Sequence, residues 1–281
     1  MIFDTHVHID DYAAPEPSRL LKSMDEHGVG RTVLLSEEPY FFGKEGLKPK
    51  EWNNARLERL FQWTKPSSGR LLPVYYIDPT EPDAVDQADQ ALDAGAIGFK
   101  VICETFYPGD ERAMPVYQHI ADAGKAILFH SGILWDYGDN GNYNRPCNWE
   151  CMFDIAGIHF ALAHISWPWC DECIALYGKF SAMRYSPRYK NQQMYIDMTP
   201  GTPSCYRQRV LDTLYSVFEE GYEYLDSRLL FGSDSFTGEY DASFPADLAA
   251  KDRERLRKAG FSAETAENIV TRNALAFWGI D

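Results

Sequence analysis

Eight short runs rich in β-branched and aliphatic residues recur along the chain, with amphipathic segments between them. Some are almost entirely apolar, such as Thr32–Leu35 and Ala126–Phe129, which is typical of parallel strands covered on both faces. Eight strand–helix repeats favour an α/β fold, a single (β/α)₈ TIM barrel. The runs are Met1–His8, Arg31–Ser36, Arg70–Asp78, Ala96–Ile102, Lys125–His130, His159–His164, Met194–Thr199 and Arg228–Asp234.

The segments between the runs show helical spacing of apolar residues and helix stop signals. The clearest are Ser18–His27, Asp83–Ala94, Pro115–Ala123 and Ser262–Trp278. A glycine follows each of the first three, and Ser262 is a favourable N-cap for the last. A doubly wound sheet is the main alternative, but no Gly-x-Gly-x-x-Gly follows the first run. We therefore expect one barrel domain over residues 1–281.

Three stretches have the composition of long loops, namely Glu37–Trp52, Trp135–Asn148 and Arg184–Gln193. Each follows or approaches the end of a predicted strand. Since the loops after barrel strands line the active face, we expect all three near that face.

Composition limits the class of protein. The formal net charge is −15, and an acidic surface repels nucleic-acid phosphates and anionic lipids. No apolar stretch approaches the ~18–20 residues that span a bilayer, and the N-terminus lacks the pattern of a signal peptide. Six cysteines in 281 residues do not make a disulfide scaffold. These features predict a cytoplasmic protein with reduced thiols, without nucleic-acid or membrane partners.

Residues suited to metal binding occur at the ends of several runs. The first run ends in His6-Val7-His8, and residues two apart in a strand project to the same side. The fifth, sixth and eighth runs end in His130, His164 and Asp234. Because the strand ends of a parallel barrel open on one rim, these groups predict a site for zinc, manganese, iron or cobalt. Such a cation lowers the pKa of bound water to ~7 and makes hydroxide available.

The remaining candidate ligands favour ordinary structural roles. His27 and His119 lie in predicted helices, and His159 starts a strand at the opposite end of the barrel. The pairs Cys147/Cys151 and Cys170/Cys173 have spacings that a zinc ribbon tolerates, but a predicted strand separates them. We expect unpaired thiols.

Taken together, the motifs resemble the amidohydrolase superfamily, and more narrowly the amidohydrolase-2 group of TIM-barrel metal-dependent hydrolases and related decarboxylases. The matching segments are Ile2–His8, Gly98–Val101, Leu128–Gly132, Asn144–Pro146, Leu162–Trp169 with Asp171-Glu172, Phe231–Asp234 and Asn273–Gly279. Their order along the chain is specific for the fold and the metal site, and much less so for the substrate.

The resemblance implies that His6, His8, His130 and Asp234 hold one divalent metal, for which Zn²⁺ is the first choice. Asp234 would also accept a proton from the metal-bound water. His164 would be a general base, a substrate contact or a ligand to a second metal.

The same resemblance allows two roles for Lys100. A carboxylated lysine on the fourth strand bridges two metals in some members, whereas an ordinary lysine could bind an anionic substrate group; we favour the ordinary form. Arg145, Arg184 and Arg188 are further candidates for gripping a carboxylate. Trp169, with Trp135, Tyr137 and Trp167, could wall a pocket.

Three functions follow. The first is hydrolysis of a small-molecule lactone, ester or amide, and the second is non-oxidative decarboxylation of an aromatic or unsaturated acid with the same ligands. The third is a non-catalytic binding barrel, which the complete set of ligand types disfavours. Members of the family are usually homodimers or larger, so we expect a homo-oligomer.

Overall fold

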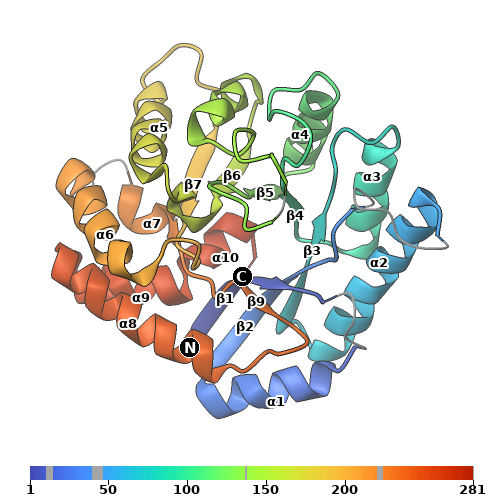
Figure 1. Cartoon of the computed structure of the whole chain (residues 1–281), viewed down its shortest axis with the longest axis horizontal. Coiled ribbons are helices and arrows are strands. Elements are labelled where there is room, and N and C mark those ends of the chain that lie inside the picture. The colour runs from blue at the N-terminus through green and yellow to red at the C-terminus, as the bar shows by residue number, and fades with distance from the viewer. Residues whose placement is uncertain (11–14, 40–46, 137, 220–223, 281) are drawn as a thin grey trace.

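The computed structural model describes residues 1–10, 15–39, 47–136, 138–219 and 224–280. Within these residues nine parallel strands form one curled sheet in the order β8-β7-β6-β5-β4-β3-β2-β1-β9, with helices around its outside (Figure 1). This arrangement is consistent with an α/β barrel of the TIM type. The strands are β1 Ile2–His8, β2 Val29–Leu35, β3 Leu71–Tyr76, β4 Gly98–Val101, β5 Ala126–Phe129, β6 His159–Leu162, β7 Gln193–Asp197, β8 Leu229–Leu230 and β9 Ser235–Phe236.

Helices follow the strands along the chain, as the alternating sequence pattern predicts. The α-helices are α1 Pro17–His27, α2 Pro49–Thr64, α3 Ala84–Ala94, α4 Ala113–Asp122, α5 Cys170–Met183, α6 Ser204–Phe218, α7 Leu225–Arg228, α8 Ser243–Ala259, α9 Ala263–Thr271 and α10 Asn273–Trp278. Short 3₁₀ segments occupy Lys65–Ser67, Pro146–Asp154 and Ala163–Ser166. No helix in the described ranges is both long and apolar enough to cross a bilayer.

The chain after β8 reaches β1 at the other end of the sheet. The Phe231 carbonyl accepts a hydrogen bond from Thr5 N at 3.1 Å, and Asp234 N donates to the His6 carbonyl at 2.9 Å. The prediction of one strand over Arg228–Asp234 is wrong, because α7 includes Arg228 and the ladder with β7 ends at Leu230. A physical reason is that the Asp4 carboxylate accepts from Ser233 N at 2.8 Å, so this amide is not available to a ladder.

Two apolar clusters lie on the two faces of the sheet, and the smaller one shows which end of the strands is closed. The larger one lies between the sheet and the helices. The smaller one contains alternating strand residues, including Val74, Leu128 and Tyr195, packed with Phe277 and Trp278 of α10. A Cβ at Gly98, the first residue of β4, would lie 2.4 Å from the Trp278 ring. The α10 helix therefore covers the amino-terminal end of the strands.

Two helix boundaries differ from the prediction. Ser262 caps its helix as expected, accepting from Thr265 N at 3.1 Å, but the helix ends at Thr271 and α10 follows as a separate element. At the junction Arg272 has φ −119°, outside the helical range. The predicted loop Glu37–Trp52 also ends early, because α2 begins at Pro49, where a missing N–H costs nothing.

Candidate metal centre

The strand period of two places polar side chains at the carboxyl ends of the strands. Leu128 and Tyr195 belong to the smaller apolar cluster, and His130 and Asp197 follow two residues later. Side chains two apart point to the same face of a strand, so both polar groups continue the inner face of the sheet. Lys100 of β4 is the register partner of Leu128 and lies on this face too. All three side chains are buried.

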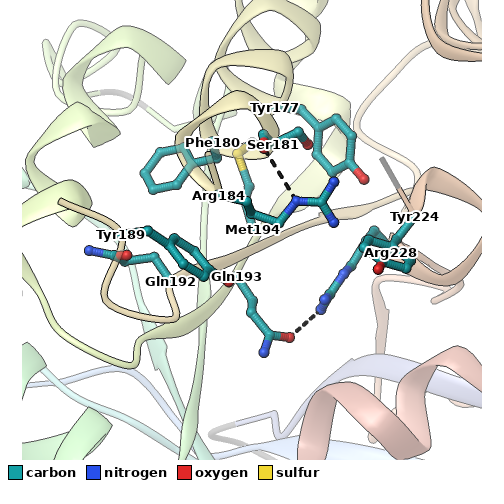
Figure 2. A pocket seen from close by; sticks show the side chains of 10 residues that line it. All are labelled: Tyr177, Phe180, Ser181, Arg184, Tyr189, Gln192, Gln193, Met194, Tyr224 and Arg228. Carbon is teal, nitrogen blue, oxygen red and sulfur yellow. Dashed lines mark hydrogen bonds between the residues drawn. The ribbon is translucent and has the colours of Figure 1, made fainter. Parts of the chain in front are cut away.

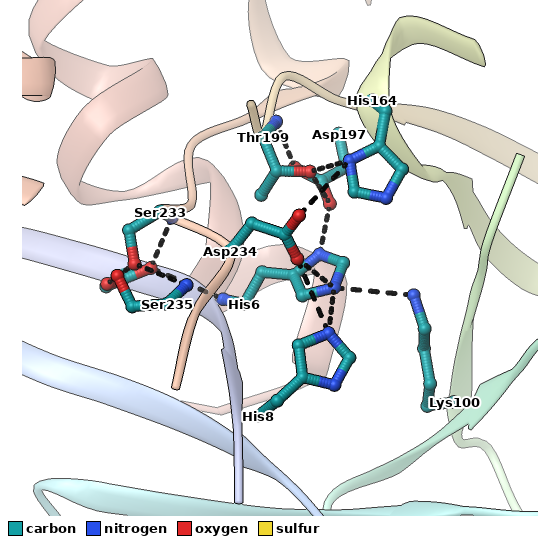
Figure 3. Close-up of polar contacts among 10 residues, drawn as sticks. His6, His8, Lys100, His164, Asp197, Thr199, Ser233, Asp234 and Ser235 are labelled. Atoms are coloured by element: carbon teal, nitrogen blue, oxygen red, sulfur yellow. Dashed lines mark hydrogen bonds and ion pairs between the residues drawn. The ribbon is translucent and has the colours of Figure 1, made fainter. Parts of the chain in front are cut away.

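The side chains of His6, His8 and Asp234 converge on one point (Figure 3). The Nε2 atoms of the two imidazoles are 3.1 Å apart, and Asp234 Oδ1 lies 3.3 Å from the first and 3.4 Å from the second. Atoms that ligate one metal at about 2.1 Å stand about 3.0 Å apart in octahedral and about 3.4 Å apart in tetrahedral geometry. These three atoms therefore have the spacing of ligands to a single cation.

His164 lies next to these three side chains, and His130 lies beside His164. His164 Nδ1 is 4.0 Å from Asp234 Oδ2, and one ligand atom from each of His6, His164 and Asp234 fits within 4.8 Å. The His130 ring centroid is 4.9 Å from that of His164. His130 Nε2 is buried and has no hydrogen-bond partner among the described residues. A buried imidazole nitrogen without a partner is costly unless it binds something, and it too fits a metal site.

The carboxylate of Asp197, at the end of β7, orients the His6 ring. His6 Nδ1 lies 2.8 Å from Asp197 Oδ2, and both side chains are fully buried. Thr199 donates to Asp197 from its backbone N at 2.9 Å and from its hydroxyl at 3.0 Å. A carboxylate on Nδ1 favours the tautomer in which Nε2 keeps its lone pair for a ligand. We did not single out Asp197 from sequence, although it falls at the end of a predicted strand.

Asp4 holds the segment that carries Asp234. It is fully buried and accepts hydrogen bonds from Ser233 N at 2.8 Å and from Ser233 Oγ at 2.6 Å. The next residue, Asp234, has φ 59°. Sequence reasoning did not identify Asp4 either, since one acid inside an apolar strand gives no periodic signal.

The protonation states of the site suit cation binding. Burial lowers the pKa of His6 and of His130 well below the ordinary value and that of His164 to about 4, so these rings are neutral at pH 7. Burial acts to raise the pKa of Asp234, but its contacts with His164, His6 and His8 hold that pKa well below its usual range. Burial also lowers the pKa of Lys100 to about 8, and its Nζ lies 3.4 Å from His6 Nε2.

The turn after β6 presents His164 in a way that the sequence did not predict. We expected a strand to run through His164, but β6 ends at Leu162. His164, Ile165 and Ser166 then adopt φ values of 63°, 46° and 56°. Three successive non-glycine residues in this sparsely populated region mark a strained turn, a feature that clusters at functional sites. A Cβ at Gly201 would lie 2.6 Å from His164 Cβ, so glycine is required for this approach.

The remaining predicted pocket residues fall into two groups. Arg145 forms an ion pair with Glu172 in the first turn of α5, and its guanidinium carbon lies 5.3 Å from the centre of the Trp169 ring. Trp135 stacks on Trp167 with ring centroids 5.6 Å apart and remains 76% exposed. These side chains therefore form an aromatic and ionic surface, and the Arg145 guanidinium is already paired with a carboxylate of the protein. Tyr137 lies outside the described residues.

The prediction that Arg184 and Arg188 lie near the active face is wrong. They lie in the segment that leads from α5 into Gln193, the first residue of β7, which pairs with His159 at the start of β6. This is the amino-terminal end of the strands, opposite the candidate metal ligands. Figure 2 shows Arg184 in a pocket there. Its guanidinium carbon lies 4.5 Å from the centre of the Tyr224 ring.

The cysteines do not gather into a metal site. Cys147 and Cys151 lie in the 3₁₀ segment Pro146–Asp154, whereas Cys170 and Cys173 lie in the first turn of α5. Burial raises the pKa of Cys170 to about 11 and that of Cys173 to about 12. Across the described ranges, His6, His164 and Asp234 form a group with ligand atoms close enough to hold a metal, and no cysteine belongs to such a group.

Comparison with known proteins agrees with the fold. A family model described as amidohydrolase matches residues 3–280. No curated protein matches the chain. Among solved structures, an amidohydrolase II superposes with a TM-score of 0.67 at 18% identity, covering 99% of this chain and 100% of that one.

Two further structures carry other descriptions. The apo IDCase of Metarhizium anisopliae has a TM-score of 0.63 at 14% identity and covers 99% of this chain and 97% of its own. The 4-oxalomesaconate hydratase of Rhodopseudomonas palustris has a TM-score of 0.60 at 14% identity, with coverages of 99% and 96%. At these identities the similarity establishes a common fold, and the reaction must be argued from the site.

Proposed function

The chain belongs to the amidohydrolase-2 family, and from this premise we propose that it is a divalent-metal-dependent hydrolase of a small-molecule lactone, ester or amide. One observation carries the proposal: the Nε2 atoms of His6 and His8 and the Oδ1 atom of Asp234 stand 3.1–3.4 Å from one another. We further propose one closed (β/α)₈ barrel domain over residues 1–281, with the metal site at the carboxyl ends of its strands.

Each candidate ligand has a specific part in this proposal. His6, His8, His130 and Asp234 hold one ion, Zn²⁺ by first choice, while Mn²⁺, Fe²⁺ or Co²⁺ suit the same donors. A bound cation of this kind supplies a Lewis acid that polarises a carbonyl and lowers the pKa of water. Lys100 acts as an ordinary lysine beside His6; a second ion would require its carboxylation.

The protein groups then move the protons of the hydrolysis. Asp234 is ionised, so its carboxylate accepts a proton from the water that adds to the acyl carbon. When the bond to the leaving oxygen or nitrogen breaks, that proton passes to the leaving group. His164 is neutral, and its Nδ1 lies 3.0 Å from Thr199 Oγ1 and 4.0 Å from Asp234 Oδ2. This position suits a general base or a substrate contact.

The alternative is a metal-dependent decarboxylase of an aromatic or unsaturated acid, which uses the same ligands. The two reactions differ in their products, because hydrolysis of a lactone, ester or amide forms a carboxylate product without carbon dioxide. We expect the zinc-loaded protein to form the carboxylate product from members of a panel of lactones, esters and amides, measured by chromatography. It should release no carbon dioxide from phenolic or unsaturated acids. Carbon dioxide release without hydrolysis of any panel member would exclude the hydrolase.

Variants connect the activity to the site. His6→Ala and Asp234→Ala should lose bound metal and hydrolysis together. His164→Ala should keep most of the metal and lose most of the rate; if it also empties the site, His164 is a ligand. His27→Ala is the matched control, because this exposed histidine ends α1, away from the candidate ligands, and its Nδ1 lies 3.0 Å from Ser23 O of its own helix.

A further inference from the structure

A large cavity lies beside the candidate metal ligands. It has a volume of about 600 Å³, and His8 forms part of its wall. The other walls come from residues at or just after the carboxyl ends of β1 to β5 and from Phe236 of β9, which stacks on the His8 ring with centroids 5.3 Å apart. Because it adjoins a metal ligand and has the size of a small-molecule site, this cavity is the natural place for the substrate.

The wall of this cavity is acidic. Its described lining residues include five carboxylate side chains and neither lysine nor arginine: Asp10, Glu37, Glu38, Glu104 and Asp136. One of these charges is already balanced, since Glu37 Oε1 lies 2.5 Å from Arg59 NH1. We therefore base the argument on Glu104 and Asp136, the two acids carried by the segments after β4 and β5.

Glu104 and Asp136 share one hydrogen-bond donor. Asn140 Nδ2 donates to Glu104 Oε2 and to Asp136 Oδ2, each at 2.7 Å. Neither acid forms an ion pair with a cation in the described ranges. Burial is the main cause that raises the pKa of Glu104 to about 7, and the nearby charges of Asp136 and Glu38 add to it. Two carboxylates held together without a counter-ion favour the approach of a cation.

Tyr76 is a second, independent sign of a polar ligand. It ends β3, pairs in register with Lys100, lines the cavity and is 4% exposed. Its hydroxyl has no hydrogen-bond partner among the described residues. Burial, helped by Glu104, raises the pKa of Tyr76 well above its usual value, so the hydroxyl remains protonated and can donate or accept. A hydroxyl without a protein partner, on a side chain that is almost fully buried at a cavity wall, favours a polar partner in that cavity.

The cavity on the other side of the site has the same charge. It has a volume of about 380 Å³ and is lined by Asp234, Glu239 and Asp241, again with no lysine or arginine among its described residues. Phe236 lines both cavities. Arg145, the predicted anchor for an anion, lines neither and is paired with Glu172. The walls of these two cavities therefore repel a substrate carboxylate.

We propose that the substrate is cationic, with a protonated amine or a similar group held by Glu104 and Asp136 while its acyl group lies at His8 and Asp234. The exposed Trp135 ring, which also lines the cavity, provides an aromatic face for the same cation. This inference rests on the proposed hydrolase, and it replaces the expectation of an anionic substrate.

The test uses three hydroxamates that differ only in their terminal group, because a hydroxamate binds the metal in all three cases. They are 6-aminohexanohydroxamic acid, heptanohydroxamic acid and pimelic acid monohydroxamate, titrated calorimetrically into the zinc-loaded protein. We expect the ammonium compound to bind at least tenfold more tightly than the methyl compound, about 1.4 kcal/mol, and the carboxylate compound to bind most weakly. Tightest binding of the carboxylate compound, or no binding of any of the three, would overturn the inference.

Variants assign the preference to the two acids. Glu104→Gln and Asp136→Asn keep an oxygen that accepts from Asn140 and should each reduce the ammonium preference at least threefold. Glu254→Gln, an exposed acid of α8, is the charge-matched control and should not change it. An ammonium preference that survives both site variants would contradict the assignment.

The charge inference and the hydrolase proposal can fail separately. Hydrolysis rates are measured on matched esters and amides with the same three terminal groups. Selective binding of the ammonium compound without hydrolysis of any matched ester or amide would leave the charge inference standing and remove the hydrolase. Hydrolysis that favours the carboxylate substrates would leave the hydrolase proposal standing and remove the charge inference.

Discussion

Substitution of Asp197 tests how the fold prepares His6 to bind a metal. Asp197 Oδ2 lies 2.8 Å from His6 Nδ1, and neither side chain is exposed, so bulk water does not compete for this contact. Without it, the tautomer that leaves Nε2 free to ligate loses its main support. Asp197→Asn and Asp197→Ala should therefore weaken metal binding without removing any direct ligand.

The size of the effect follows from the contacts. Loss of such a supporting group typically costs about 10–100-fold in metal affinity, or about 1.4–2.8 kcal/mol. Asn keeps an oxygen that accepts from His6 Nδ1 and from Thr199, so we expect about tenfold for Asp197→Asn. Ala keeps neither contact and should approach about a hundredfold. Burial raises the pKa of Asp197 to about 6, so a neutral residue is tolerated there and the fold should survive.

The assay is competition of each variant with a chromogenic zinc chelator, alongside urea denaturation to monitor folding. Asp226→Asn, in α7 at the amino-terminal end of the barrel, is the matched control and should bind zinc like the unmodified protein. A folded Asp197→Ala variant with zinc affinity within twofold of the control would refute the reasoning. It would mean that the ring orientation of His6 does not depend on this carboxylate.

Three further results are expected. Asp252→Ala should lower the free energy of unfolding in urea by about 3–5 kcal/mol, because it leaves the buried Arg207 guanidinium without its bidentate partner; a change below about 1 kcal/mol would contradict this. The double variant Cys170→Ser, Cys173→Ser should keep the zinc content of the unmodified protein by atomic emission, whereas a loss of one zinc per chain would reveal a thiolate site. Because the folded-state pKa of Glu104 is about 7, above the value of an unfolded glutamate, protonation favours the folded state and stability falls as pH rises from about 4.5 to 7. Glu104→Gln removes this pH-dependent loss of stability. Between pH 5 and 8 the free energy of unfolding of the variant should therefore rise by about 1 kcal/mol relative to that of the unmodified protein, a value reduced for the partial exposure of Glu104. Parallel pH profiles of the two proteins would rule out the raised pKa of Glu104.

The convergence of the candidate metal ligands could be predicted from the sequence because strand periodicity and parallel-sheet topology act together. His6 and His8 lie two apart in a strand, so they must share a face. The carboxyl ends of parallel strands must share a rim, which brings His130, His164 and Asp234 to the same place. Neither argument requires the details of side-chain packing.

The supporting acids and the direction of some connections could not be predicted. Asp4 and Asp197 are single buried carboxylates within apolar runs. Their supporting roles are visible only in tertiary contacts, those of Asp4 with Ser233 and of Asp197 with His6. Arg184 was placed at the wrong end of the strands because the end of α5 at Met183 was not predicted. When the end of the helix is unknown, a connection that enters a strand looks the same in the sequence as one that leaves it.

The turn at His164 shows a third kind of limit. Three consecutive left-handed residues without glycine have no local sequence signal, because none of them prefers that conformation. The turn exists because the surrounding structure holds it, including the bond from Thr202 Oγ1 to the His164 carbonyl at 2.8 Å.

The convergence of side chains on one cation is tested most directly by anomalous diffraction from crystals grown with zinc. A single anomalous peak per chain is predicted, within bonding distance of the Nε2 atoms of His6 and His8 and of the Asp234 carboxylate. A peak bound by cysteines instead, or no peak at these three side chains, would contradict the assignment of the metal centre and the hydrolytic function that depends on it.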